Sequence, residues 1–253
     1  MVESFMNRPH STSRFSLLAS LRLALCLCII APAGAVDIPL RPFSASYDLH
    51  KSGMHFATAE LTLAPLEGRW RWHITTEARG IYALLYSKKP YTETIFSLDQ
   101  GILQLQSVVL SDANDEDTED YESASFDWAK GKMKALRKGR KISLALSAEV
   151  FDYQTIHLLA ASMQLQQLQQ ATVSFYRKAK LTDSTLVYQG DASVDFQGKE
   201  IAARVYEQTI NGSTTKTKYY YDAQNPLLPL LVETRKENDS PTILRLRKVE
   251  WHS

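Results

Sequence analysis

Residue types suited to metal or acid–base chemistry are scattered along the chain without a recognised spacing. Beyond the first 35 residues the histidines are His50, His55, His73, His157 and His252. They form no H-x-H or H-E-x-x-H spacing and no Cys/His pair of the kind that holds zinc. His50 and His55 flank a predicted hairpin turn and could approach each other, although solvated histidines at strand ends explain them better. We therefore expect no metal site.

An acidic segment, residues 112–120, has the oxygen-rich composition that Ca²⁺ prefers. It lacks the central glycine and the terminal glutamate of an EF-hand loop. A block of like charges is usually a solvated loop, so we expect a loop and leave calcium binding open.

Catalytic motifs are absent from the sequence. It contains no G-x-S-x-G elbow, phosphate-binding Walker loop or dinucleotide fingerprint. Its two cysteines, Cys26 and Cys28, lie in a segment that we expect to be removed, which leaves no thiol nucleophile. Carboxylates are plentiful, but sequence spacing cannot reveal a pair set for glycoside hydrolysis. We expect a protein that is not an enzyme and uses no cofactor.

The first 35 residues have the three parts of a secretory signal peptide. Arginines precede or open a short apolar run at residues 23–30, and Ala33-Gly34-Ala35 forms an A-x-A cleavage site. The run is too short to span a bilayer, and no later apolar run is long enough to do so. We predict cleavage after Ala35, export to the periplasm and a soluble product of residues 36–253. Its charges nearly balance, which gives no reason to expect nucleic-acid binding.

The elements that must position any site are mostly strands. Apolar residues alternate with polar ones and turn residues recur about every ten positions, which predicts antiparallel strands. Residues 152–169 differ, because apolar side chains there recur at helical spacing behind Asp152, a plausible N-cap. We predict a mainly β fold of one domain, residues 36–253. It is an antiparallel meander forming a barrel or open half-barrel, with one prominent amphipathic helix.

Several short motifs recur in the order and spacing of one bacterial family. They are Tyr47 with Gly53, residues 91–94, residues 126–128, the helix beginning at Asp152, and residues 227–229 followed by a strand at 231–233. Together they resemble the domain-of-unknown-function 3108 family of bacterial, mostly Gram-negative, exported proteins, over nearly all of residues 43–251. The resemblance implies a periplasmic β-rich fold with no established activity, and it transfers no catalytic residue.

The connector at residues 80–91 is apolar and aromatic, whereas a connector between strands is usually polar. It would be either a plug over one end of the barrel or the rim of an apolar ligand cavity. For the rim we predict Tyr82, Leu84, Leu85, Tyr86 and Tyr91 at the mouth, with Trp70 and Trp72 deeper along the preceding strand.

These features favour a non-enzymatic periplasmic protein that binds an apolar or amphipathic, lipid-like molecule of the cell envelope in a β-barrel cavity. The alternative is a structural or scaffolding envelope protein that acts through protein–protein contacts on exposed strands. A cavity lined by aromatic side chains would favour the first role, and a densely filled interior would favour the second.

Overall fold

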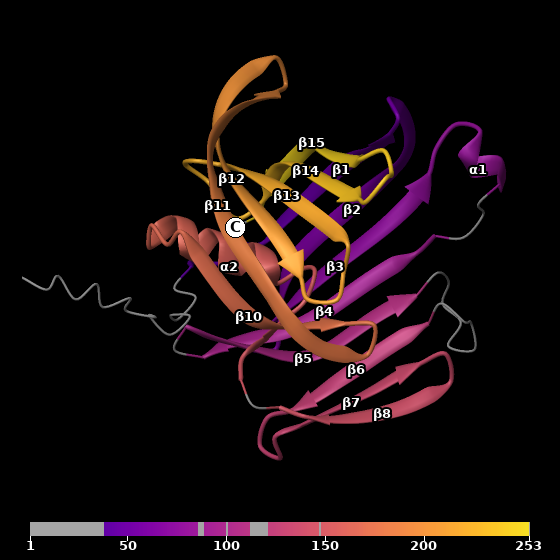
Figure 1. The fold of residues 1–253 in the computed structure, drawn as a ribbon, viewed down its shortest axis with the longest axis vertical. Coiled ribbons are helices and arrows are strands. Elements are labelled where there is room, and N and C mark those ends of the chain that lie inside the picture. The colour runs from indigo at the N-terminus through magenta and orange to yellow at the C-terminus, as the bar shows by residue number, and fades with distance from the viewer. Residues whose placement is uncertain (1–37, 86–88, 100, 112–120, 147, 253) are drawn as a thin grey trace, which may run out of the picture. The chain divides into compact units, whose positions relative to one another are not determined.

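The computed structural model describes residues 38–85, 89–99, 101–111, 121–146 and 148–252 (Figure 1). The predicted signal peptide, Tyr86 and the acidic segment at residues 112–120 lie outside these ranges. The chain divides into Met1–Pro32 and Ala33–Ser253, and all described residues belong to the second unit.

Among the described residues there are fifteen strands and two helices. In chain order they are β1 (Phe43–Lys51), β2 (Met54–Leu66), β3 (Arg69–Ala78), α1 (Tyr82–Leu85), β4 (Tyr91–Asp99), β5 (Ile102–Ser111), β6 (Glu122–Asp127), β7 (Lys132–Arg137), β8 (Arg140–Ala145), β9 (Val150–Phe151), α2 (Ile156–Leu165), β10 (Gln170–Arg177), β11 (Lys180–Phe196), β12 (Lys199–Ile210), β13 (Thr215–Asp222), β14 (Pro229–Lys236) and β15 (Thr242–Trp251). None of the helices in these ranges has the length and apolar character of a membrane span.

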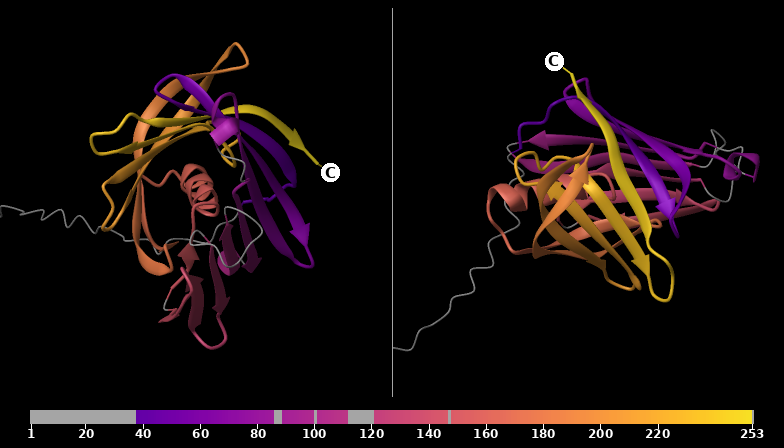
Figure 2. Two further views of the ribbon diagram at one scale, coloured as in Figure 1. Left: turned by 90° about the vertical axis from the view of Figure 1, so that its right-hand side faces the viewer. Right: turned by 90° about the horizontal axis from the view of Figure 1, so that it is seen from above.

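All the strands belong to one sheet, in the order β8-β7-β6-β5-β4-β3-β2-β1-β15-β14-β13-β12-β11-β10-β9. Neighbouring strands are antiparallel except β9 and β10, which are parallel. The first and last strands pair with each other in the middle of the sheet, while β8 and β9 form its two ends. The sheet curls without closing, so the predicted antiparallel meander and open half-barrel are confirmed (Figure 2).

Tight turns fix the register of several neighbouring strands. Ser52-Gly53 and Gln197-Gly198 both have positive φ at the two central positions, 50° and 79° in the first and 55° and 76° in the second. This is the backbone of a type I′ hairpin turn, whose twist matches that of the strands that it joins. The turn then fixes which alternate residues face inward. In β2 these include Ala57, Ala59 and Leu61, which are all buried.

Helix α2 lies inside the curve of the sheet (Figure 2). The single prominent helix predicted within residues 152–169 is therefore present, but the expected polar face is not. Eight of its ten residues are buried, including Ser162 and Gln164. Strands surround the helix on several sides, and a helix enclosed in this way is buried all round rather than along one stripe.

Asp152 ties the start of this helix to the sheet. Its Oδ1 atom accepts hydrogen bonds from the backbone N–H groups of Gln154 (3.1 Å) and Thr155 (2.8 Å). The Thr94 hydroxyl of β4 donates to its other carboxylate oxygen. The helix itself begins after Thr155, whose own side chain caps nothing, so Asp152 performs the predicted capping one turn earlier.

Replacing Asp152 with Ala should lower the free energy of unfolding by roughly 2–4 kcal/mol, because it removes a cap and leaves buried donors unpaired. Urea denaturation followed by circular dichroism measures this loss. Asp183→Ala, at an exposed aspartate of β11, is the matched control and should change stability by no more than about 0.5 kcal/mol. Equal stability of the two variants would contradict the anchoring role of Asp152.

Candidate functional site

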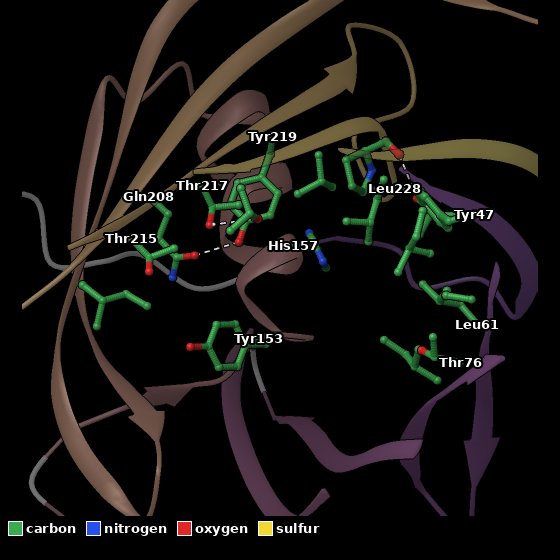
Figure 3. Close-up of a pocket in the computed structure, with 18 of the residues that line it drawn as sticks. Tyr47, Leu61, Thr76, Tyr153, His157, Gln208, Thr215, Thr217, Tyr219 and Leu228 are labelled. Carbon is green, nitrogen blue, oxygen red and sulfur yellow. Dashed lines mark hydrogen bonds between the residues drawn. The ribbon is translucent and has the colours of Figure 1, made fainter. Parts of the chain in front are cut away.

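The concave face of the sheet contains a cavity of about 370 Å³. Strands β1, β2, β3, β14 and β15 supply one set of its lining residues, and β12 and β13 supply another. Tyr153 and His157, just before and within α2, lie between them (Figure 3). The cavity is therefore built from both ends of the chain and from the helix that the sheet encloses.

The two walls differ in chemistry. The first wall is mainly aliphatic, with side chains such as Leu49, Leu61, Ile74, Leu228, Val232 and Leu244. The second carries amide and hydroxyl groups from Gln208, Thr215 and Thr217. Figure 3 shows these three on the side opposite Leu61 and Leu228. A molecule held between the walls would meet apolar surface on one side and hydrogen-bonding groups on the other.

Gln208 is fixed in place although it faces the cavity. Its Nε2 atom donates to Ser184 Oγ at 2.9 Å, and its Oε1 atom accepts from the Tyr219 hydroxyl at 2.7 Å. Buried amides need such partners, and both partners lie on adjacent strands of the same sheet. The polar wall is therefore preorganised, with the Gln208 amide held in one orientation.

His157 lies at the centre of the cavity floor, among aromatic rings. Its ring centroid is 5.3 Å from that of Tyr219 and 5.7 Å from that of Trp72, and its Nδ1 atom is hydrogen-bonded to the Tyr221 hydroxyl at 2.7 Å. Burial lowers the pKa of His157 to about 4. The imidazole is thus neutral at pH 7 and contributes no charge to the cavity.

Arg177, at the end of β10, carries the only charge at neutral pH among the lining side chains that the structure describes. It is half-buried, and its Nε atom is buried without a hydrogen-bond partner. Tyr153 lies close enough for the Arg177 charge to act on its hydroxyl, although burial prevails and raises the pKa of Tyr153. Tyr153 itself packs edge-on against Phe175, with ring centroids 5.1 Å apart.

His50 and His55 do come together, as their positions beside the hairpin turn suggested. Their rings stack at 5.1 Å with an angle of 25° between the planes. Ring nitrogens bind metals in the plane of the imidazole, so stacked rings do not converge on one ion. Within the described ranges, no three His, Cys, Asp or Glu residues are grouped so as to hold a metal.

The predicted tryptophans lie on the strand and the face that reach the cavity, without lining it. Trp72 is fully buried against Phe43 and His157, and Trp70 is half-buried against the core. Side chains two positions apart on a strand share a face, and Ile74 and Thr76, next along β3, do line the cavity.

The connector residues lie elsewhere. Tyr82, Leu84 and Leu85 form α1, where the Tyr82 ring contacts Phe56 at 6.1 Å and Leu84 is 88% exposed. Tyr91 lies on β4 beside the ring of His73, 5.8 Å away. Tyr82, Leu84 and Tyr91 are not among the lining residues of the cavity, and the side chain of Leu85 lies outside the described part of the structure. Ligand binding by the connector stays a prediction.

The lining residues that sequence reasoning missed had one visible signal. In β13 the sequence Thr-Lys-Thr-Lys-Tyr-Tyr-Tyr places Thr215, Thr217, Tyr219 and Tyr221 on one face. A strand face of hydroxyl-bearing side chains in a mainly apolar sheet is unusual, and it marks the polar wall.

Comparisons with known proteins found distantly similar solved structures. No family model matches the chain, and no curated protein matches it. One similar solved structure is the β-barrel-like protein of domain of unknown function DUF1849 from Brucella abortus, with 11% identity over 85% of this chain and 100% of that one, at a TM-score of 0.49. An exported protein with a YmcC-like fold from Bacteroides fragilis has 6% identity over 83% and 96% of the two chains, at a TM-score of 0.37.

The lipoprotein YmcC from Escherichia coli is also similar, with 8% identity over 83% of this chain and 85% of that one, at a TM-score of 0.30. These proteins are described as β-barrel-like, exported or lipoprotein, and none by an activity. All three TM-scores lie below 0.5, and no role is transferred from them. Membership of the domain-of-unknown-function 3108 family stays a prediction.

The pH dependence of stability should reveal the buried, neutral His157. Between pH 6.5 and pH 4 the unfolded state binds more protons at this residue than the folded state, so stability falls as the pH falls. Its contribution to this loss is at most about 3 kcal/mol. Urea denaturation at pH 7, 5 and 4 should give a steeper loss for the wild type than for His157→Gln. Parallel curves would contradict the low pKa.

The double variant Ile81→Ser with Leu84→Ser distinguishes the plug from an exposed connector. Ile81 and Leu84 are 68% and 88% exposed, so the free energy of unfolding should change by no more than about 0.5 kcal/mol. Leu103→Ser, at a fully buried residue, is the comparison and should cost several times more. A loss of roughly 2–5 kcal/mol per connector residue would identify a plug after all.

Proposed function

We propose that this chain is a non-enzymatic protein of the bacterial periplasm that holds a lipid-like, amphipathic molecule of the cell envelope in the cavity of its half-barrel. The observation that carries the proposal is the cavity itself, with an aliphatic wall facing a wall of hydroxyl and amide groups. Its volume of about 370 Å³ falls within the range of roughly 300–1,000 Å³ that small-molecule sites occupy.

An apolar ligand would gain the most binding free energy in the interior of the half-barrel. Removing apolar surface from water contributes about 25 cal/mol per Å², and the aliphatic wall presents such surface to any chain that enters. Gln208 and its partners are already hydrogen-bonded, so an incoming ligand need not break protein contacts to meet them. Preorganisation of this kind lowers the cost of binding.

The predicted signal peptide supports the periplasmic location, and the resemblance to the domain-of-unknown-function 3108 family points to the same compartment. A protein in that compartment is surrounded by membrane lipids and lipoproteins. Both the predicted location and the cavity therefore favour a ligand with an apolar chain.

The rival role is that of a scaffold in the envelope that acts through protein contacts. The observation in its favour is the exposure of Ile81 and Leu84, two large apolar side chains outside the cavity. A partner that covers α1 would remove them from water, and it would do so without using the cavity.

Filling the cavity should separate the two roles. Thr76 lines the cavity, whereas the adjacent Thr75 is not among the lining residues because neighbouring side chains point to opposite faces of a strand. Thr76→Trp should weaken binding of the uncharged apolar probe N-phenyl-1-naphthylamine at least tenfold, and Thr75→Trp should leave it unchanged. Probe fluorescence measures binding, and thermal unfolding checks that both variants fold.

Native mass spectrometry of the wild type purified from its own envelope should show a bound small molecule that is depleted in Thr76→Trp. Equal probe binding by both variants, or a wild type that neither carries a molecule nor takes up the probe, would favour the scaffold.

A further inference from the structure

We infer that the ligand of this cavity is an amphiphile with one apolar chain and one negatively charged oxyacid group, and that Arg177 binds the charged group. The inference rests on the proposed function and deepens it, because it specifies the charge of the ligand and the residue that selects it.

The charge balance of the cavity is the first step. Among the described residues that line the cavity, Arg177 is the one charged side chain and none is a carboxylate. His157 is neutral at pH 7 because burial lowers its pKa to about 4. The cavity therefore carries one positive charge that no other lining side chain in the described ranges balances, and a half-buried charge of this kind favours an anionic ligand.

The second step is that the Arg177 guanidinium group is only partly paired: it is hydrogen-bonded to the Tyr153 side chain, and its Nε atom has no partner. The nearby carboxylate of Glu122 is already used, since Arg137 Nε lies 2.8 Å from its Oε2 atom and the Ala179 backbone N–H donates to its Oε1 atom at 3.0 Å. A guanidinium group offers a planar set of donors that matches carboxylate and phosphate oxygens, and part of that set is unused here.

The third step concerns orientation. Tyr153, which adjoins Arg177, is 43% exposed and so marks the side of the cavity that opens to solvent. Figure 3 shows its hydroxyl on the same side as Gln208 and Thr215, across from Leu61. A charged group beside Arg177 and Tyr153 would remain near water, while the attached chain would lie against the aliphatic wall. An amphiphile would contact Arg177 with its charged group and the aliphatic wall with its chain, whereas a purely apolar molecule would make only the second contact.

The test compares ligands that differ only in the head group. Dodecanoate and dodecyl phosphate supply the two anionic sources, and dodecanol and monododecanoyl glycerol are their neutral counterparts. Each displaces N-phenyl-1-naphthylamine from the full mature protein at pH 7.5. We expect at least one anion to bind tenfold or more tightly than both neutral ligands, and the preferred anion identifies the head group as carboxylate or phosphate.

Arg177→Gln should abolish this preference by weakening the anion at least tenfold while leaving dodecanol binding unchanged. The matched control is Arg235→Gln, which removes the same charge from an exposed arginine of β14 that does not line the cavity. It should keep the full preference.

The outcomes separate the inference from the proposed function. Equal affinity of the wild type for anionic and neutral ligands would overturn the inferred role of the ligand's charge. This result needs no variant, and it would leave the cavity as a binding site. An anion preference that survives in Arg177→Gln overturns the assignment to Arg177. Failure of all four ligands and the probe to bind overturns the proposed function itself.

Discussion

A single curved sheet has one apolar face, and within the described residues the sheet itself and helix α2 are what covers that face. Helix α2 is ten residues long, which corresponds to about 15 Å. The thirteen residues of β2 extend over about 40 Å, and β11 is longer still. The helix therefore fills only part of the concave face. The cavity is the uncovered space next to the first turn of α2, where Tyr153 and His157 line it. Its existence therefore follows from the difference in length between α2 and the strands.

Several polar groups inside the curve are paired, as buried donors and acceptors usually are. Asp152 accepts hydrogen bonds from the turn before α2 and from β4, Gln208 is held between Ser184 and Tyr219, and His157 is bonded to Tyr221. These bonds fix α2 relative to strands from both halves of the sheet. Other buried atoms have no hydrogen-bond partner, among them Trp72 Nε1, Tyr206 Oη and Arg177 Nε. What sets Arg177 apart from these is its charge, together with its place in the cavity lining.

The sequence predicted the elements well, because strand alternation and turn chemistry are local. The X-Gly turns, the antiparallel strands and the helix after Asp152 all follow from neighbouring residues. The burial of α2 on all sides could not be predicted, since it depends on strands far away in the sequence that curl around the helix. Trp70 and Trp72 share a face of β3 with Ile74 and Thr76, which line the cavity, while a role of the two tryptophans in binding stays a prediction. The position of the first turn of α2 relative to β3 decides which residues on that face line the cavity. No local sequence pattern encodes that position.

The pairing of β1 with β15 has a consequence for the order of folding. These two strands join the halves of the sheet at its centre, and β14 reaches β1 only through β15. A chain that emerges from its amino-terminal end cannot form a continuous sheet until its last strand is present. Contacts between such distant segments make folding slow. Until then β1 and β14 each present an unpaired edge beside an uncovered apolar face, which is a state prone to aggregation. A chain of this topology would therefore need protection from aggregation while it is incomplete, and its folding yield would be limited by the arrival of residues 242–251.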